Sequence, residues 1–155
     1  MAKYYSTKTY GTDRGFSCCF RQWKAKHSHC SFLHGYSLGF KLIFECESLD
    51  ERNWVMDFGG LKDFKLFLEK TFDHTLLIAS DDPYVSQMLK LSDSSLADVR
   101  IVSGVGCEKF AEIAYAEMNL ILKEKKKNGT LLNQTVKLKS VEVFEHAGNS
   151  AIYEA

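Results

Sequence analysis

The chain has 155 residues, of which 45% are hydrophobic and 26% are charged, with a single proline. This length suffices for one domain with a buried core, and the composition excludes disordered and collagen-like proteins. Lysine plus arginine equals aspartate plus glutamate at 20 each, so we expect no nucleic-acid partner, because non-specific nucleic-acid binders carry a basic excess. Any anionic ligand must therefore be bound by local charges.

The distribution of apolar residues and cysteines predicts a cytoplasmic protein with free thiols. No apolar run approaches the roughly 18 residues of a membrane span, so no membrane partner is expected. The first residues lack the apolar core of a signal peptide. The five cysteines form no CxxC pair, which argues against a zinc ribbon and against a thioredoxin-type motif. A reducing cytoplasm is the simplest compartment for such cysteines.

The first half of the chain predicts strands followed by a helix. Residues 7–20, rich in Thr, Tyr, Phe and Cys and interrupted at 11–15, indicate either a strand pair or one long strand with a bulge. Residues 36–46 largely alternate between apolar and polar side chains, which is the period of a half-buried strand. Apolar residues at helical spacing then predict a helix that follows residues 57–60 and ends near Thr71.

The middle of the chain predicts two more helices. Two aspartates before Pro83 resemble a helix start, so we expect a short helix through Lys90 within the otherwise unassigned segment 79–103. A longer helix is predicted over residues 107–124, where apolar side chains recur at helical spacing. The Asn-Gly pair at 128–129 is typical of the left-handed cap that ends a helix.

The end of the chain predicts the last strand and completes the fold class. Residues 135–145 alternate as a strand, and residues 151–153 complete it after a break at 148–149. The order strands, helix, helix, strand predicts an α+β fold with an antiparallel sheet and helices on one face. No repeat or linker divides the chain, so residues 1–155 are expected to form a single domain. Exposed sheet edges are commonly covered by self-association, which predicts a homo-oligomer.

Three of the five histidines and one cysteine gather in one short stretch, as His27, His29, Cys30 and His34. One interpretation is a polar loop whose histidines point to water. The other is a metal site beside a thiol, because imidazole suits zinc and a catalytic zinc site uses three protein ligands and an open position. A cysteine near zinc or near protonated histidine becomes a usable base or nucleophile.

Two further positions carry candidate chemistry. Asp73 directly precedes His74, and in a turn its carboxylate would orient the imidazole and fix its tautomer; the alternative is a capping aspartate beside an exposed histidine. Glu145 follows apolar Val143 by two residues, which predicts that it lies on the covered face of the last strand. A covered carboxylate needs partners, and the guanidine-like edge of a pterin or a guanine would match it bidentately. His146 is either a further proton-transfer group or a surface histidine.

Five motifs follow one another in a specific order, although each is weak alone. They are Cys30-x-x-x-His34-Gly35, Val55-Met56-Asp57-Phe58-Gly59 with Leu61-Lys62, Asp73-His74-x-x-Leu77, Glu145, and Ala151-Ile152-Tyr153. Together they resemble the 6-pyruvoyltetrahydropterin synthase and 6-carboxytetrahydropterin synthase family, over about residues 16–153.

The resemblance implies a fold, an assembly and a reaction. The fold is the tunnelling fold (T-fold), an antiparallel four-stranded sheet with two helices on one face, and subunits associate as trimers or hexamers with active sites between them. The substrate is a small-molecule pterin, 7,8-dihydroneopterin triphosphate. Bacterial members convert it to 6-carboxy-5,6,7,8-tetrahydropterin for queuosine and other 7-deazaguanines, releasing acetaldehyde and triphosphate. Mammalian-type members eliminate the triphosphate to give the pyruvoyl product.

The same resemblance implies roles for individual residues. Cys30 is the base that acts on the substrate side chain, and Asp73 with His74 forms a proton relay. Glu145 anchors the pterin ring, and the helix start at Cys107 and Glu108 offers it backbone donors. Removing a proton next to a developing carbonyl also needs an electrophile that holds the side-chain oxygens.

The zinc-binding positions of the family are altered in this chain. The resemblance implies three histidine ligands, but Phe20 and Tyr36 stand at two of these positions and only His34 remains. Phenylalanine cannot bind zinc, and neutral tyrosine is a poor ligand. Either zinc is lost, or a rearranged zinc site combines His34 with His27 and His29. The density of histidines in this stretch favours the rearranged site.

The leading prediction is therefore a pterin lyase that makes 6-carboxytetrahydropterin. Three alternatives remain open: a 6-pyruvoyltetrahydropterin synthase, a metal-free pterin-binding paralogue, and an aldolase or epimerase acting on dihydroneopterin, whose chemistry needs no zinc.

Overall fold

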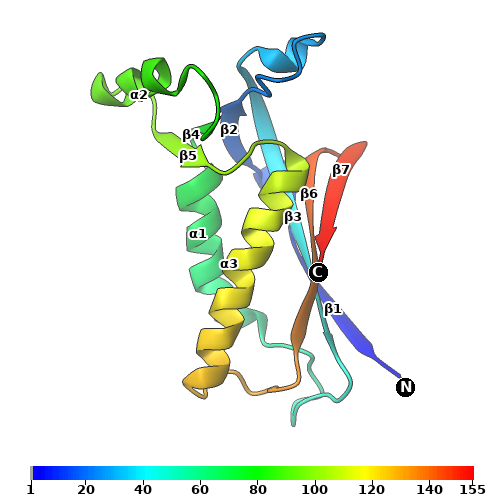
Figure 1. Cartoon of the computed structure of the whole chain (residues 1–155). Helices are drawn as coiled ribbons and strands as arrows, with labels where there is room; N and C mark the ends of the chain where they lie inside the picture. The colour runs from blue at the N-terminus through cyan, green and yellow to red at the C-terminus, as the bar shows by residue number, and fades with distance from the viewer. Residues whose placement is uncertain (1) are drawn as a thin grey trace.

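The structure, a computed structural model, describes residues 2–155 as a mixed sheet covered by helices (Figure 1). The strands are β1 (Tyr4–Tyr10), β2 (Phe16–Phe20), β3 (His34–Cys46), β4 (Thr75–Ala79), β5 (Val99–Val102), β6 (Lys137–His146) and β7 (Asn149–Glu154). The helices are α1 (Lys62–Phe72), α2 (Val85–Asp93) and α3 (Cys107–Lys127), with 3-10 turns η1 (Thr12–Arg14), η2 (His29–Ser31) and η3 (Phe58–Leu61). The predicted α+β class is confirmed.

The first two strands, β1 and β2, form one interrupted strand along the same edge of β3. Tyr10 pairs with Phe40 and Phe16 pairs with Leu38, so residues 11–15 stand opposite a single residue of β3. The segment is therefore two strands separated by the 3-10 turn η1, with the interruption at the predicted residues, and both strands pair with the same edge of β3.

The sheet is larger than the four antiparallel strands predicted, and it is not purely antiparallel. Strands β2, β3, β6 and β7 form the antiparallel core, but β4 pairs parallel with β2 and β5 pairs parallel with β4. All residues of β4 are buried, so this strand lacks the apolar–polar alternation that marks a half-buried strand. Strand β5 is only four residues long. The segment 79–103 thus contributes the end of β4, then α2, then β5.

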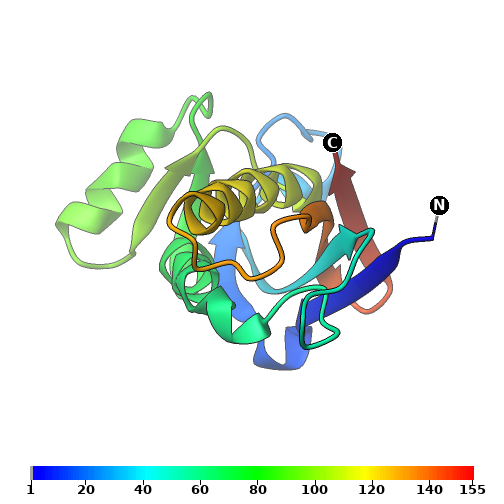
Figure 2. The same ribbon diagram turned by 90° about the horizontal axis from the view of Figure 1, so that it is seen from below.

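The two main helices lie side by side on one face of the sheet, as predicted (Figure 1). Helix α1 matches its expected bounds, and α3 continues to Lys127, where Gly129 with a φ of 74° forms the predicted left-handed cap. Helix α2 begins at Val85, later than the aspartates suggested, and it stands to one side of the sheet and the other two helices (Figure 2). Within the described residues, no helix is long and apolar enough to cross a membrane.

The core joins both helices to the centre of the sheet. Phe72 of α1 is fully buried, and its ring centroid lies 5.0 Å from that of Phe40 in β3 and 5.2 Å from that of Phe110 in α3. Replacing such a buried ring by alanine typically costs about 3–5 kcal/mol of stability. This cluster fixes the start of α3 against the sheet, and the functional hollow opens at that point.

Candidate functional site

A hollow of about 370 Å³ lies where the sheet meets the N-terminus of α3. Four residues of the predicted site line it: Cys30, Cys107, Glu108 and Glu145. The remaining lining residues are Phe20, Gln22, Ala25, Tyr36, Val105, Gly106, Asn149 and Ser150. The structure thus gathers the expected base and the expected substrate anchors, which lie far apart in the sequence.

Glu145 reaches the hollow from a distorted part of β6. It is the extra residue of a bulge between β6 and β7, because Ser150 and Asn149 pair with the residues on either side of it. Bulges of this kind redirect a side chain. The carboxylate is about one-third exposed, and its Oε1 accepts a hydrogen bond of 2.8 Å from Asn149 Nδ2. Its other oxygen, Oε2, accepts no hydrogen bond from any described residue.

His146 follows Glu145 in the sequence, but it stabilises the turn after β6 and does not line the hollow. Its Nδ1 accepts a hydrogen bond of 3.0 Å from the Gly148 N–H, and its ring is mostly exposed. Of the two interpretations of this residue, the surface histidine agrees with its position.

The start of α3 supplies backbone donors. Gly106 precedes the helix with a φ of 109°, a conformation that only glycine adopts easily, and no side chain caps the helix. The first N–H groups of an α-helix have no intrahelical acceptor. The amides of Cys107 and Glu108 are therefore free to donate to a ligand in the hollow, where the helix dipole also adds positive potential.

Cys30 lies on η2, in the loop between β2 and β3. Ser28 Oγ accepts a hydrogen bond of 3.2 Å from the Cys30 N–H, and the Gln22 N–H donates to the Cys30 carbonyl at 2.8 Å. These contacts fold the loop back on itself, so that an exposed thiol borders the hollow.

Cys107 is the second thiol of the hollow, and its environment keeps it protonated. Burial, followed by the negative charges of Glu145 and Glu108, raises the pKa of Cys107 to about 11. A thiol with this pKa is neutral near pH 7 and is a poor base. Cys30, which is exposed, lacks that burial.

Asp73 and His74 form the predicted pair at the end of α1. Asp73 Oδ1 accepts hydrogen bonds from the Ser17 N–H at 3.2 Å and from His74 Nδ1–H at 2.9 Å. The contact fixes the tautomer and leaves His74 Nε2 free. His74 has a φ of 58° and its N–H donates to the Ser17 carbonyl. Such strained backbone in a residue other than glycine is concentrated at functional sites.

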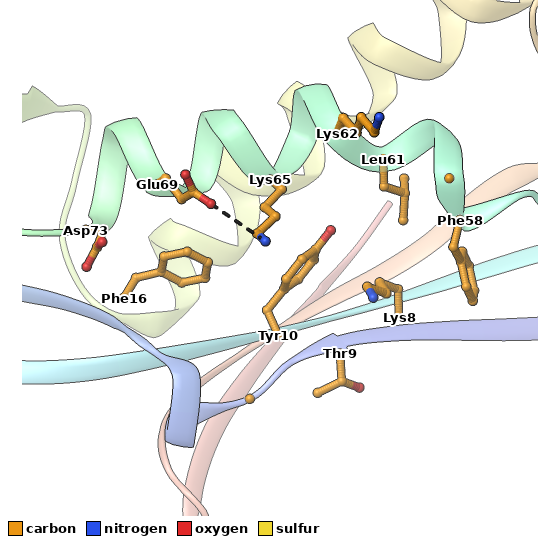
Figure 3. Close-up of a pocket in the computed structure, with 12 residues that line it drawn as sticks. Lys8, Thr9, Tyr10, Phe16, Phe58, Leu61, Lys62, Lys65, Glu69 and Asp73 are labelled. Atoms are coloured by element: carbon orange, nitrogen blue, oxygen red, sulfur yellow. Dashed lines mark ion pairs between the residues drawn. The ribbon is translucent and has the colours of Figure 1, made fainter.

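The Asp73–His74 pair does not share the hollow with Cys30. Asp73 lines a separate cavity of about 540 Å³ together with Tyr10, Phe16 and Lys65 (Figure 3). The His74 side chain is 85% exposed. Within one chain, therefore, the expected base and the expected relay face different openings.

The three predicted metal ligands do not form a zinc site within the chain. His27 and His29 are exposed on the loop before β3, and His34 Nδ1 lies 2.9 Å from the Phe32 carbonyl oxygen. Across residues 2–155, no three His, Cys, Asp or Glu side chains gather as a group able to hold a metal ion. The donors present do not fit zinc in a single chain, and the rearranged zinc site stays a prediction.

Phe20 and Tyr36, which occupy the other two ligand positions implied by the family, form an aromatic stack. Their ring centroids are 4.0 Å apart and their planes differ by 9°. Phe20 is buried and meets the ring of Phe110 edge-on at 5.0 Å, and the His34 ring lies 4.5 Å from Tyr36. Packed aromatic rings fill the space in which imidazole ligands would stand.

Sequence reasoning missed Arg21 and Asp82. The guanidinium of Arg21 donates to both oxygens of Asp82, at 2.8 and 2.9 Å, and to the Ser31 carbonyl at 3.2 Å. These hydrogen bonds lower the pKa of Asp82, whose side chain is almost fully buried. The pair ties the loop that carries Cys30 to the segment before α2. The two residues are 61 positions apart, and no local pattern connects them.

Comparison with known proteins agrees with the motifs. The model of the 6-pyruvoyl tetrahydropterin synthase family matches residues 11–155. Over 62 residues, the chain is 32% identical to the 6-carboxy-5,6,7,8-tetrahydropterin synthases of Rickettsia conorii and Rickettsia felis, a match that covers 39% of this chain. The chain spans about half the length of these curated relatives, since the match covers 45% of each.

Solved structures agree in fold. An uncharacterized protein from Wolinella succinogenes superposes with a TM-score of 0.79 at 21% identity, over 99% of both chains. A 6-pyruvoyltetrahydropterin synthase mutant from Plasmodium vivax superposes with a TM-score of 0.72 at 13% identity, over 100% of this chain and 99% of that one. The predicted T-fold is thereby confirmed. With the family model covering nearly all of its length, the chain belongs to the 6-pyruvoyl tetrahydropterin synthase family.

Proposed function

We propose that this protein is a lyase that converts 7,8-dihydroneopterin triphosphate to 6-carboxy-5,6,7,8-tetrahydropterin. The observation that carries the proposal is the hollow at the start of α3, which holds Cys30, Glu145 and the free amides of Cys107 and Glu108 together. The partial likeness to curated 6-carboxytetrahydropterin synthases supports this product over others. The product serves the synthesis of queuosine and other 7-deazaguanines.

The hollow offers a pterin ring complementary partners on two sides. The 2-amino group and N3–H of a pterin are parallel donors, which match a carboxylate bidentately. Glu145 has one oxygen bonded to Asn149 and the other without a donor from the described residues. The amides at the start of α3 suit the ring carbonyl, which is an acceptor. Glu145 and α3 therefore bind and orient the ring.

Cys30 is the proposed base. Its thiolate removes a proton from the side-chain carbon that is bonded to the ring, and the proton moves to sulfur. The electron pair of the C–H bond moves into the adjacent ring C=N bond, whose nitrogen takes up a proton, and this leaves an enol on the side chain. The neutral thiol of Cys107 in the same hollow is unsuited to this step. No step is assigned to zinc, because the donors gathered within one chain do not fit it.

Asp73 and His74 act, in this proposal, in the hollow of a second copy of the chain. The pair has the geometry of a relay, with Nδ1 held and Nε2 free, but it faces an opening that Cys30 does not line. Association of subunits would bring the exposed His74 of one copy to the Cys30 of another. The active assembly is then a homo-oligomer with shared sites, of the trimeric or hexameric kind.

A second candidate function is elimination of triphosphate alone, giving the 6-pyruvoyl product. The same base and ring anchor would serve it, and the matching family model carries that name. A metal-free pterin-binding paralogue would need Glu145 and the α3 amides but no ordered Asp73–His74 pair. An aldolase or epimerase would act on unphosphorylated dihydroneopterin.

The experiment is product analysis after incubation of the purified protein with 7,8-dihydroneopterin triphosphate. Chromatography of the oxidised pterins should show the 6-carboxy compound as the main product. Glu145→Gln should raise KM by about 10- to 100-fold, because it weakens a charge-assisted pair of hydrogen bonds. Glu124→Gln, an exposed residue near the C-terminal end of α3 and outside the hollow, is the matched control and should leave KM unchanged. A pterin recovered unchanged from the wild-type protein would refute the proposal.

A further inference from the structure

Tyr36 lines the hollow beside Cys30 and Glu145 and is held rigidly there. Its ring is stacked on Phe20 with centroids 4.0 Å apart, and the ring of His34 packs against it at 4.5 Å with an interplanar angle of 39°. Phe20 is itself buried in the core. The Tyr36 ring is therefore fixed before any ligand binds, which is the condition for a preorganised functional group.

The hydroxyl of Tyr36 is available to a ligand. Among the described residues, none forms a hydrogen bond with it, whereas the hydroxyl of Tyr115 donates to the Leu138 carbonyl at 3.2 Å. A phenol is a neutral hydrogen-bond donor near pH 7.

The proposed reaction lacks a donor for the side-chain oxygen of the substrate. After Cys30 removes the proton, the resulting enol gives up its O–H proton to water on the way to the carbonyl, so negative charge develops on the side-chain oxygen and must be stabilised. Asn149 and Ser150, which also line the hollow, already donate to Glu145 and Glu142. The donor set of the described residues does not fit a metal ion. The Gln22 side chain also lines the hollow, but its Oε1 accepts a hydrogen bond from the Lys24 N–H, which turns it toward its own loop. Tyr36 is the rigidly held hydroxyl that remains.

We propose that the Tyr36 hydroxyl donates a hydrogen bond to the side-chain oxygen of the pterin substrate and stabilises the enolate through which the enol left by Cys30 becomes a carbonyl. The inference rests on the proposed function and adds a catalytic residue to it. A neutral phenol in a partly buried site suits this task, because it binds the developing charge without a prior change in its own protonation. In this chain, the hydroxyl of Tyr36, whose ring is stacked on Phe20, thus takes the role of the electrophile that binds the side-chain oxygen.

The test removes only the hydroxyl. Tyr36→Phe keeps the ring and its stack on Phe20, and kcat should fall about 100-fold while KM changes little, as for other lost oxyanion donors. Tyr115→Phe removes a hydroxyl that is bonded elsewhere, so it serves as the matched control and should keep the wild-type kcat. Wild-type kcat in Tyr36→Phe would overturn the proposal. So would stoichiometric zinc whose removal abolishes turnover.

A binding measurement separates this proposal from the proposed function. Sepiapterin, a 7,8-dihydropterin with a carbonyl on the first side-chain carbon, is titrated into each protein beside 6-methyl-7,8-dihydropterin, which has no such oxygen. Tyr36→Phe should weaken sepiapterin binding about tenfold and leave the methyl compound unchanged, since it removes one hydrogen bond. Equal sepiapterin affinities of the wild-type protein and of Tyr36→Phe would overturn the role of Tyr36, even if the wild-type protein converts its substrate. If Tyr36→Phe binds sepiapterin more weakly than the wild-type protein but the wild-type protein forms no product, the reaction is refuted and the contact stands.

Discussion

Cys30 and Cys107 line the same hollow but differ in solvent exposure, and this difference assigns their roles. Cys107 lies at the start of α3, where burial and two carboxylates oppose ionisation. Cys18, on β2, is buried as well, and burial raises its pKa to about 12. Cys30 is exposed on a loop. The sequence points to Cys30 through its spacing to His34, whereas the inertness of Cys107 depends on neighbours that only the fold brings near.

Alkylation rates should follow these environments. At pH 8, iodoacetamide should modify Cys30 well before Cys107 and Cys18, because the thiolate is the reactive form and their pKa values are raised to about 11 and about 12. Raising the pH should speed modification of Cys107 about tenfold per unit until the pH approaches its pKa. Mass spectrometry of tryptic peptides gives the order, and Cys30→Ser is the control that should lose the fast phase. Earlier modification of Cys107 would contradict the assignment.

The loop that carries Cys30 depends on a contact between distant elements. Arg21, just after β2, binds Asp82 in the segment before α2 and also the carbonyl of Ser31. The segment that follows the short buried strand β4 thus anchors the loop. Helices α1 and α3 were predictable from their periodicity. Strand β4 was not, because a short buried strand shows no alternation, and β5 was not, because it is only four residues long.

Asp82→Asn should destabilise the protein and reduce turnover. We expect a loss of about 2 kcal/mol in the free energy of unfolding, because the substitution leaves the guanidinium of Arg21 without its counter-charge in a largely buried site. The folded-state pKa of Asp82 is lowered, so its contribution is present above the unfolded pKa of about 4 and is lost as the pH falls through the lower, folded value. Urea unfolding at pH 7 and at pH 3 measures the difference in unfolding free energy between the wild-type protein and Asp82→Asn. This difference should be smaller at pH 3. Asp93→Asn, on the exposed surface of α2, is the control, and equal stability of both variants at pH 7 would contradict the account.

The candidate site residues of one chain lie at two separate cavities, so the proposed catalysis depends on the association of two copies. The order of motifs along the chain predicts both halves of the site, but the sequence cannot reveal that Cys30 and Asp73 line different cavities. That separation follows from β2, which carries the loop of Cys30 at one end and contacts Asp73 near the other. A second copy of the chain is therefore part of the proposed catalytic unit.

Mixed oligomers test the shared site. Cys30→Ala and His74→Ala should each abolish turnover when pure, because each removes one half of every site. Co-expressed and co-purified in equal amounts, they should recover about one quarter of the wild-type activity, since a random mixture pairs an intact Cys30 with an intact His74 at about a quarter of shared sites. Separately tagged subunits allow the mixed species to be isolated and its mass measured. An inactive mixed oligomer of the correct composition would contradict the sharing.

The most direct test of the central claim is the ratio of acetaldehyde to triphosphate released from 7,8-dihydroneopterin triphosphate. The account predicts equal amounts of the two, formed at the same rate, with no release by the Cys30→Ala variant. Coupled assays with alcohol dehydrogenase for acetaldehyde and a phosphatase-linked assay for triphosphate follow both in one time course. Triphosphate without acetaldehyde would assign the 6-pyruvoyl product, and release of neither would contradict the assignment of this chain as a pterin synthase.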